Sequence, residues 1–400
     1  MNQLITTLHI FCRVVDNFGD IGVCWRLCRQ LHSEHGFVVH LWVDDLSSFQ
    51  VLCAQVRTDL AHQTVQQVQI HHWQDALEAN QDWHAVAQAD VIIEAFACEV
   101  PAVLVQAMAM QARQPRWINL DYLSAESWVA GCHGLPSVHP QLGLTKYFYF
   151  PGFDQQTGGL LVEANYAARQ QAFFSAPDGR ARFLSEQFSS VQNSVWADLQ
   201  RVGTEKNTEP LVFSLFCYPD APVAALLAAC ANAENQSLCL VAEGVATAAL
   251  GDFFGEPVAV GRVYQRGALV LFVLPFMSQA SYDQLLWSCD LNFVRGEDSF
   301  VRAQLAGKPF VWQIYPQEAQ AHFIKLDAFL QQYLAQSEAA EPVLALWSAW
   351  NQAPQGEVAA LAQLPLFAAQ LQAHARDWAK RLLQSDDLAT RLVQFIEKIS

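Results

Sequence analysis

The chain has little positive charge and no long hydrophobic run. Its 400 residues include 23 Lys and Arg against 39 Asp and Glu, giving a formal net charge of −16. This charge repels a phosphate backbone, so we expect no nucleic-acid partner. No apolar run reaches the roughly 18 residues of a membrane span, and the first seven residues lack a basic segment before an apolar stretch. We therefore expect a soluble, cytoplasmic protein with no membrane partner.

Three common catalytic motifs are also missing. The turn from Asp16 to Gly22 contains only Gly19 and Gly22, which is not the Gly-x-Gly-x-x-Gly fingerprint of a dinucleotide-binding turn. The chain has neither a Gly-x-x-x-x-Gly-Lys-Ser/Thr phosphate loop nor a Gly-x-Ser-x-Gly elbow. NAD chemistry, ATP hydrolysis and ordinary serine-esterase chemistry therefore lose their usual support.

No metal-binding pattern is present. Most of the ten cysteines lie in apolar runs, where reduced thiols behave as small core residues. Cys24 and Cys28 form one close pair and His71 and His72 another, but neither has a second pair at ligand spacing. We expect no structural metal, and we assign no role to three further histidines, His133, His139 and His322.

Apolar runs alternate with amphipathic stretches, the pattern of parallel sheets covered by helices. Hydrophobic residues make up 52% of the chain, enough for more than one core. The predicted strands are 8–14, 38–43, 91–93, 117–120, 211–216, 237–241, 269–274, 291–294 and 310–313. The predicted helices include 23–33, 101–111, 222–233, 282–289, 300–306 and 387–399.

The polar stretch 201–210 interrupts the alternation, as a linker between compact units does. We predict two Rossmann-like domains facing each other across a cleft, an N-terminal one over 1–200 and a C-terminal one over 211–378. A C-terminal helix within 379–400 is expected to pack back on the first domain. Ligands in such sheets bind beyond the carboxyl ends of the strands.

An acidic loop, Asp16-Asn17-Phe18-Gly19-Asp20, follows the first predicted strand. One carboxylate can point into the cleft while the other orders the loop. A plainer interpretation is that at least one of them caps the following helix. Phe18 either faces a ligand or, as is commoner for an aromatic residue, fills the core.

A second loop, Arg295-Gly296-Glu297-Asp298-Ser299, stands between a predicted strand and a predicted helix. Arg295 can grip a phosphate, Ser299 and nearby amides can receive its other oxygens, and Glu297 can hold sugar hydroxyls. The plainer alternative is a solvated helix N-terminus capped by Asp298 or Ser299.

Four residues near strand ends suggest a nucleotide base. Phe216, Tyr218 and Phe276 can form a stacking surface, and Gln279 can read a base edge through its amide. Any one of these alone is more often a core residue.

Three stretches together resemble the protein-arginine rhamnosyltransferases that modify translation elongation factor P, the EarP family. They span nearly the whole chain: Val14-Val15-Asp16-Asn17-Phe18-Gly19-Asp20-Ile21-Gly22; Pro151-Gly152-Phe153 with Thr157-Gly158-Gly159-Leu160; and Asp290-Leu291-Asn292-Phe293-Val294-Arg295-Gly296-Glu297-Asp298-Ser299-Phe300-Val301-Arg302-Ala303.

The resemblance implies a GT-B fold, with the acceptor, elongation factor P, on the N-terminal domain and the donor, dTDP-β-L-rhamnose, on the C-terminal one. It implies that Asp20 is the catalytic base with Asp16 in support, and that transfer inverts the sugar without a metal or cofactor. The implied donor-binding residues are Phe216, Tyr218, Phe276, Gln279, Arg295, Glu297, Asp298 and Ser299.

Two other interpretations remain open from the residues. A GT-B enzyme with a different acceptor would carry much the same donor loop. A non-catalytic nucleotide-sugar sensor or protein-binding scaffold would keep both domains, although the presence of both Asp16 and Asp20 argues against it.

Overall fold

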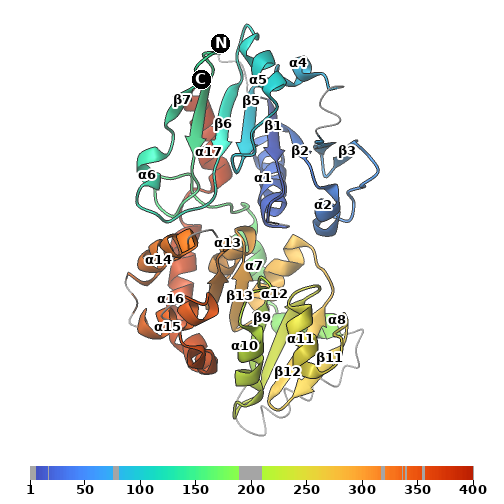
Figure 1. Ribbon diagram of the computed structural model, residues 1–400, viewed down its shortest axis with the longest axis vertical. Helices are drawn as coiled ribbons and strands as arrows, with labels where there is room; N and C mark the ends of the chain where they lie inside the picture. Colours follow the sequence, from blue (N-terminus) through green and yellow to red (C-terminus); the bar gives the residue numbers. More distant parts are fainter. Residues whose placement is uncertain are drawn as a thin grey trace. The chain divides into compact units, whose positions relative to one another are not determined.

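The computed structural model describes residues 6–16, 18–74, 81–188, 210–316, 320–335, 337, 340–353 and 356–399 (Figure 1). The chain divides into two compact units. The first comprises Met1–Ala164 and Leu383–Ser400, and the second comprises Asn165–Leu382. Each unit contains a largely parallel sheet covered by helices, as the sequence pattern predicts.

The first unit is built on an eight-stranded sheet in the order β3-β4-β2-β1-β5-β6-β8-β7. Neighbouring strands are parallel except at the two edges, where β3 and β7 run antiparallel to β4 and β8. Central strands such as β1 and β5 are mostly apolar and almost fully buried because helices cover both faces, although they include the buried polar residues His9 and Glu94. The strands are β1 (Thr7–Cys12), β2 (Val38–Val43), β3 (His62–Val65), β4 (Val68–His72), β5 (Val91–Ala95), β6 (Arg116–Leu120), β7 (Pro136–Val138) and β8 (Thr145–Tyr149).

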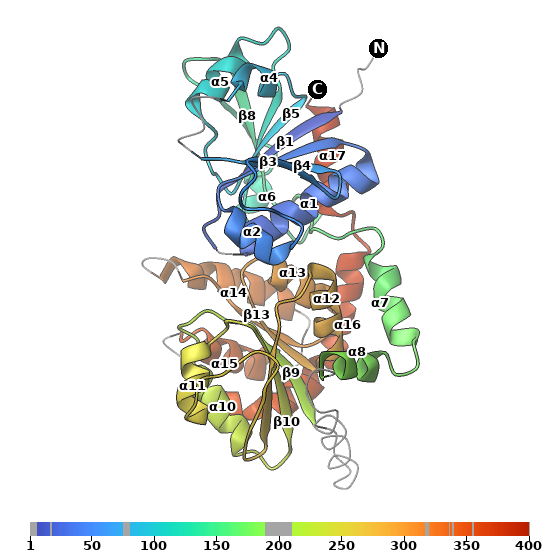
Figure 2. The ribbon, with the colours of Figure 1, turned by 90° about the vertical axis from the view of Figure 1, so that its right-hand side faces the viewer.

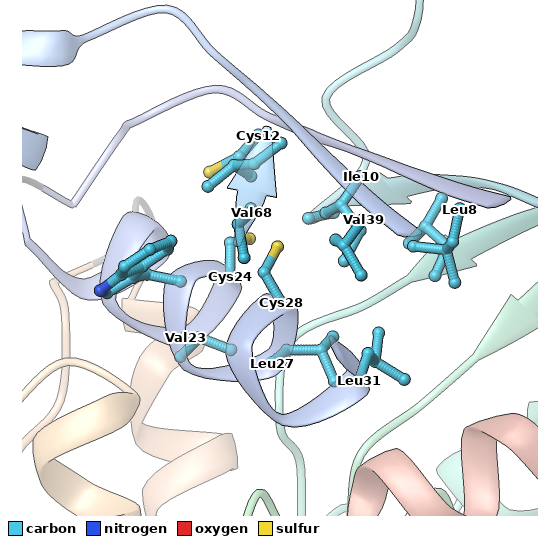
Figure 3. Close-up of a cluster of buried hydrophobic side chains, with 14 of the residues drawn as sticks. Leu8, Ile10, Cys12, Val23, Cys24, Leu27, Cys28, Leu31, Val39 and Val68 are labelled. Atoms are coloured by element: carbon cyan, nitrogen blue, oxygen red, sulfur yellow. The ribbon is translucent and has the colours of Figure 1, made fainter. Parts of the chain in front are cut away.

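The helices of this unit form two layers (Figure 2). One core cluster joins the sheet to α1, α2 and α17, and the other joins it to α4 and α5. Cys12, Cys24 and Cys28 lie inside the first cluster (Figure 3), and all ten cysteines of the chain are free thiols. The helices are α1 (Gly19–His35), α2 (Leu46–Leu52), α4 (Trp83–Val86), α5 (Ala102–Ala109), α6 (Val129–Cys132) and α17 (Leu388–Lys398).

The last helix, α17, packs against α1 in the first unit. Asp387 caps it, accepting the backbone N–H groups of Ala389 (2.9 Å) and Thr390 (3.2 Å). The same carboxylate accepts Nε2 of Gln30 in α1 at 2.9 Å. Arg391 donates to the carbonyls of Asp154 and Thr157 in the loop that carries the middle family-like motif, so this motif fastens α17 to the unit.

Replacing Asp387 by alanine should lower the free energy of unfolding by about 1–2 kcal/mol, because the helix loses its N-cap and Gln30 loses an acceptor. Asp386→Ala, at the exposed neighbouring position, is the matched control and should change stability by less than about 0.5 kcal/mol. Urea unfolding of both variants measures the difference. Equal midpoints would show that the cap contributes nothing.

Four histidines form an array across β1, β2, β4 and β3. Trp42 donates Nε1–H to Nδ1 of His9 at 2.9 Å, and the His9 ring stacks on His40 at 4.2 Å. Nδ1 of His40 lies 2.9 Å from Nε2 of His71, whose Nδ1 lies 2.9 Å from Nδ1 of His62. Burial lowers the pKa of His9 well below its usual value, that of His40 less, and that of His71 to about 3, with the neighbouring rings adding to the effect at His9 and His71.

This array predicts a loss of stability in acid. Below about pH 6.5 the unfolded chain binds protons on His9, His40 and His71 more readily than the folded chain does, so the free energy of unfolding falls as the pH falls. Each such ring contributes a slope of about 1.4 kcal/mol per pH unit. His71→Gln should therefore reduce the slope between pH 6.5 and 5 by about that amount in urea unfolding, whereas the exposed His84→Gln is the control. A slope that His71→Gln leaves unchanged would refute this explanation.

The second unit contains a six-stranded sheet in the order β11-β12-β10-β9-β13-β14, parallel except for the edge strand β11. Its strands are β9 (Leu211–Leu215), β10 (Ser237–Ala242), β11 (Val263–Arg266), β12 (Leu269–Leu274), β13 (Leu291–Arg295) and β14 (Phe310–Gln313). Its helices are α7 (Tyr166–Ser175), α8 (Gly179–Phe188), α10 (Val223–Ala231), α11 (Thr247–Phe254), α12 (Gln279–Ser288), α13 (Asp298–Leu305), α14 (Ala321–Leu334), α15 (Ala340–Trp350), η2 (Val358–Gln363) and α16 (Leu364–Leu383).

The division between the units differs from the predicted boundary at residue 200. Helices α7 and α8 belong to the second unit. Tyr166 of α7 accepts the indole N–H of Trp287 at 2.9 Å, and the guanidinium of Arg302 lies 4.3 Å from the centre of its ring. Arg180 of α8 makes a two-pronged ion pair with Asp290 at 2.8 and 2.9 Å. Sequence periodicity does not report these long-range contacts, so it could not place the boundary.

The other predicted boundaries also move. Of the predicted linker, residues 201–209 lie outside the described residues, and Pro210 directly precedes β9. At the C-terminal end, the predicted return segment began at 379. The structure assigns 379–382 to the second unit and the remainder, including α17, to the first.

Candidate functional site

The strand order of the first sheet reverses direction beside β1. From β1 the chain moves to β2 and β4 on one side, whereas β5, β6 and β8 lie on the other. Loops that follow β1 and β5 therefore diverge at the carboxyl end of the sheet, and open α/β sheets bind ligands at such a switch point. The loop with Asp16 and Asp20 connects β1 to α1 at this point.

Asp20 orders this loop. It is the second residue of α1 and only 2% exposed. Its Oδ2 accepts the backbone N–H groups of Val15 (2.8 Å) and Asp16 (2.9 Å). The sequence left open whether one carboxylate orders the loop or caps the helix. In the structure Asp20 orders the loop, and this role is compatible with a catalytic one.

Asp16 is half-exposed and lies against Gly19. A Cβ atom at position 19 would stand 2.7 Å from Oδ2 of Asp16, so a side chain there would push the carboxylate away. Phe18 is half-exposed at the N-cap of α1, where its side chain makes no cap hydrogen bond. Asn17, also predicted to belong to this loop, lies outside the described residues.

The surroundings of Asp20 alter its basicity. Burial raises the pKa of the Asp20 carboxyl, while the amides of Asp16 and Val15 and the hydroxyl of Tyr122 act in the opposite direction and the charge of Asp16 raises it. The balance is a pKa above the ordinary value. A carboxylate with a raised pKa is a stronger base, closer to the range in which general bases operate.

Tyr122 is a site residue that sequence reasoning missed. It stands two residues beyond β6, and its hydroxyl hydrogen-bonds the Asp20 carboxyl. The sequence did contain a signal for Tyr122. It follows a predicted parallel strand, and the carboxyl ends of parallel strands lie at the same sheet edge as the loop after β1. The distance of about 100 residues from Asp20 conceals the contact in the sequence.

The second sheet has its own switch point, between β9 and β13. From β9 the chain moves to β10 and then β12, whereas β13 and β14 lie on the other side. Phe216 and Tyr218 follow β9, and the loop from Arg295 to Ser299 follows β13. The structure thus brings together two groups of residues that the sequence assigned to a donor site.

Arg295 contacts both aromatic residues. Its guanidinium carbon lies 4.6 Å from the ring centre of Phe216 and 4.6 Å from that of Tyr218. Such cation–π contacts hold the guanidinium over both rings at the carboxyl edge of the sheet. The backbone N–H of Tyr218 donates to Oε1 of Gln313 at 2.7 Å, which fixes one side of this arrangement.

The loop after β13 is shaped by its backbone. Gly296 has φ +63°, a left-handed conformation that favours glycine. Trp312 donates its indole N–H to the Gly296 carbonyl at 3.0 Å. The Ser299 hydroxyl accepts the Arg295 N–H at 3.2 Å and bonds the Arg295 carbonyl, so it orders the turn in this structure.

The remaining predicted donor residues lie at the same edge. Nε2 of Gln279, at the start of α12, donates to Oδ2 of Asp298 at 3.3 Å. Glu297 is the N-cap of α13 and Asp298 begins that helix. Phe276 is 36% exposed, and its N–H donates to Glu243, which follows β10, at 3.2 Å. Glu243 was not predicted from the sequence.

The described part of the chain contains neither a candidate metal site nor a candidate membrane span. Within those ranges, no group of three or more His, Cys, Asp or Glu side chains is placed to hold a metal ion. None of the described helices has the length and apolarity needed to cross a membrane.

Known proteins resemble this chain along nearly its whole length. Residues 8–397 match the family described as elongation factor P (EF-P) rhamnosyltransferase EarP. A protein-arginine rhamnosyltransferase of Pseudomonas putida is 46% identical over 395 residues, covering 97% of this chain and 98% of that protein. A solved structure described as the structural basis for EarP-mediated arginine glycosylation of EF-P is 34% identical, with a TM-score of 0.62 and coverage of 98% and 99%.

The fold extends to more distant proteins. Acinetobacter baumannii MurG, at 11% identity and a TM-score of 0.50, covers 98% of this chain and 99% of its own. This likeness concerns the fold alone, and it confirms the predicted GT-B class. The family match confirms the resemblance inferred from the three sequence motifs. The chain therefore belongs to the elongation factor P rhamnosyltransferase family, EarP.

Proposed function

We propose that this protein transfers L-rhamnose from dTDP-β-L-rhamnose to an arginine side chain of translation elongation factor P, with inversion at the anomeric carbon. The observation that carries the proposal is the buried carboxylate of Asp20, held at the switch point of the first sheet in a chain of this family. An acceptor that acts in translation also implies a cytoplasmic enzyme.

The acceptor explains the need for a base. A guanidinium has a pKa above 12, so the attacking nitrogen must lose a proton as its bond to carbon forms. In the proposed step the nitrogen bonds to C1 of the sugar, the bond from C1 to the diphosphate oxygen breaks, and Asp20 takes the proton. Asp16, beside it, would help to hold the positive charge of the acceptor.

The residues at the second switch point are suited to bind the nucleotide-sugar donor. Phe216 and Tyr218 provide ring faces on which the thymine can stack, and Phe276 and Gln279 lie nearby at the same sheet edge. Arg295, which contacts both rings, would bind the negatively charged diphosphate. Because Arg295 now covers one face of each ring, a base must stack on another face or displace the guanidinium. We propose that Arg295 and the start of α13 balance the charge of the leaving dTDP, so that no metal is required.

Two measurements test this function. Intact mass of elongation factor P after incubation with the protein and dTDP-β-L-rhamnose should show one added deoxyhexose on an arginine. NMR of the product should show an α-linkage, the outcome of one inverting displacement. Donor binding without any gain in mass would favour a different acceptor or a non-catalytic protein, and a β-linkage would exclude the single displacement.

Arg295→Lys should weaken dTDP binding at least about tenfold, because lysine lacks the planar fork that spans both rings and grips a phosphate. The matched control is Arg266→Lys, which alters another guanidinium of the second unit that lies over a phenylalanine ring, that of Phe253. Isothermal titration calorimetry measures both dissociation constants. Equal constants for the two variants would remove Arg295 from the donor site.

A further inference from the structure

The turn after β5 has an unusual backbone. Phe96, Ala97 and Glu99 have φ values of +57°, +53° and +48°, a region that residues other than glycine seldom occupy. Such a conformation is unfavourable for a residue with a side chain and persists only where the surroundings enforce it. This turn lies beside the β1–α1 loop at the switch point of the first sheet.

The surroundings of Phe96 show what the turn provides. Its N–H donates to the Leu120 carbonyl at the end of β6, at 2.7 Å. Its ring stacks on Tyr122, with 4.4 Å between ring centres and 18° between planes. The left-handed conformation of Phe96 therefore lays its ring on Tyr122 at the margin of the first core cluster, against which Phe96 also packs.

The backbone of Tyr122 is also held in place, through hydrogen bonds that involve Asp121. Its N–H donates to Oδ1 of Asp121 at 2.8 Å, and the Asp121 N–H donates to the Tyr149 carbonyl at 2.9 Å. The Asn119 amide donates to Oδ2 of Asp121 at 3.2 Å. The half-buried phenol is thus held by its backbone and by its ring face, while its hydroxyl bonds Asp20.

We propose that Tyr122, with Phe96 stacked on it, is a positioning residue for Asp20, its phenolic O–H donating to the carboxylate that withdraws the acceptor proton. This inference rests on the proposed function, because that function makes Asp20 the base. The contact between Tyr122 and Asp20 does not depend on it. Two amides reach Asp20 from its own loop, and Tyr122 supplies a third donor from the loop that follows β6. The carboxylate is thereby tied to the sheet as well as to its loop.

The hydroxyl also favours the charged form of Asp20, against the effect of burial. Three other titratable groups face this carboxyl: Asp16 from the same loop, Cys12 at the end of β1 and Cys24 in α1. The pKa of Cys12 lies well above its usual value because the thiol bonds Cys24 and is buried, and that of Cys24 is also raised. The two thiols therefore stay protonated over the range in which a carboxylate titrates.

Removing the hydroxyl should raise the pKa of Asp20, because one donor to the charged form is lost. In Tyr122→Phe we expect an upward shift of about one pH unit. NMR titration of protein labelled at the aspartate carboxyl carbon measures it directly, with the Asp20 signal assigned by its absence in Asp20→Asn. Tyr147→Phe removes a phenol from the neighbouring strand β8 and is the matched control.

The kinetic consequence is a second, independent readout. The acid limb of the pH profile for transfer should move to higher pH by the same amount in Tyr122→Phe, with dTDP affinity unchanged. Phe96→Leu keeps the hydroxyl but removes the stacked ring, so it should lower kcat without moving donor affinity. A merely structural role for Tyr122 would reduce activity equally at every pH.

The outcomes separate this inference from the proposed function. An Asp20 titration that is the same in Tyr122→Phe as in the wild type overturns the positioning role. A shifted titration with an unshifted pH profile keeps the contact but shows that Asp20 is not the base, which overturns the proposed mechanism and the role built on it. A shift in both, absent from Tyr147→Phe, is the result we expect.

Discussion

The hydrogen bonds that converge on Asp20 are the constraint on which the first unit's site depends. A carboxylate that is 2% exposed is stable only if donors replace water, and the amides of Val15 and Asp16 do so from within five residues. These bonds close the turn that starts α1 and place Asp16 against Gly19. One side chain thus shapes the loop and, in the proposed mechanism, performs the chemistry. Its pKa is raised because the effect of burial outweighs that of the hydrogen bonds.

The second unit has a different set of contacts at its own switch point, between β9 and β13. There the charge is a guanidinium, and aromatic rings rather than amides hold it. At its switch point the first unit presents carboxylates suited to a cationic acceptor, whereas the second presents, beside Glu297 and Asp298, an arginine suited to a diphosphate. Parallel sheets with the same reversal in strand order supply both, since each gathers distant loops at one edge.

The sequence was most informative where strands are buried on both faces. The bounds of β2, β12 and β14 agree with the predicted 38–43, 269–274 and 310–313, because such strands are mostly apolar runs between polar turns. The antiparallel edge strands β3, β7 and β11 were missed because they are short and largely polar or exposed. Both acidic loops were found, since each combines charge with a strand end.

Other features depend on contacts that no local pattern encodes. Tyr122 reaches Asp20, and Tyr166 joins Trp287, across about a hundred residues of chain. The left-handed conformation of Phe96 is likewise invisible in a sequence, because nothing in Phe-Ala-Cys-Glu requires it. The family motif around Gly158 and Gly159 contains no residue that the sequence assigns to a site, and Thr157 and the nearby Asp154 anchor α17 through Arg391.

The central claim is that Asp20, rather than its more exposed neighbour, removes the acceptor proton. Single-turnover transfer by Asp20→Asn and Asp16→Asn, each with donor and acceptor at saturating concentrations, tests it most directly. We predict that Asp20→Asn loses transfer by about 100-fold or more while retaining its affinity for dTDP, and that Asp16→Asn loses less. Full loss in Asp16→Asn with substantial transfer in Asp20→Asn would reverse the assignment and leave Asp20 as the residue that only orders the loop.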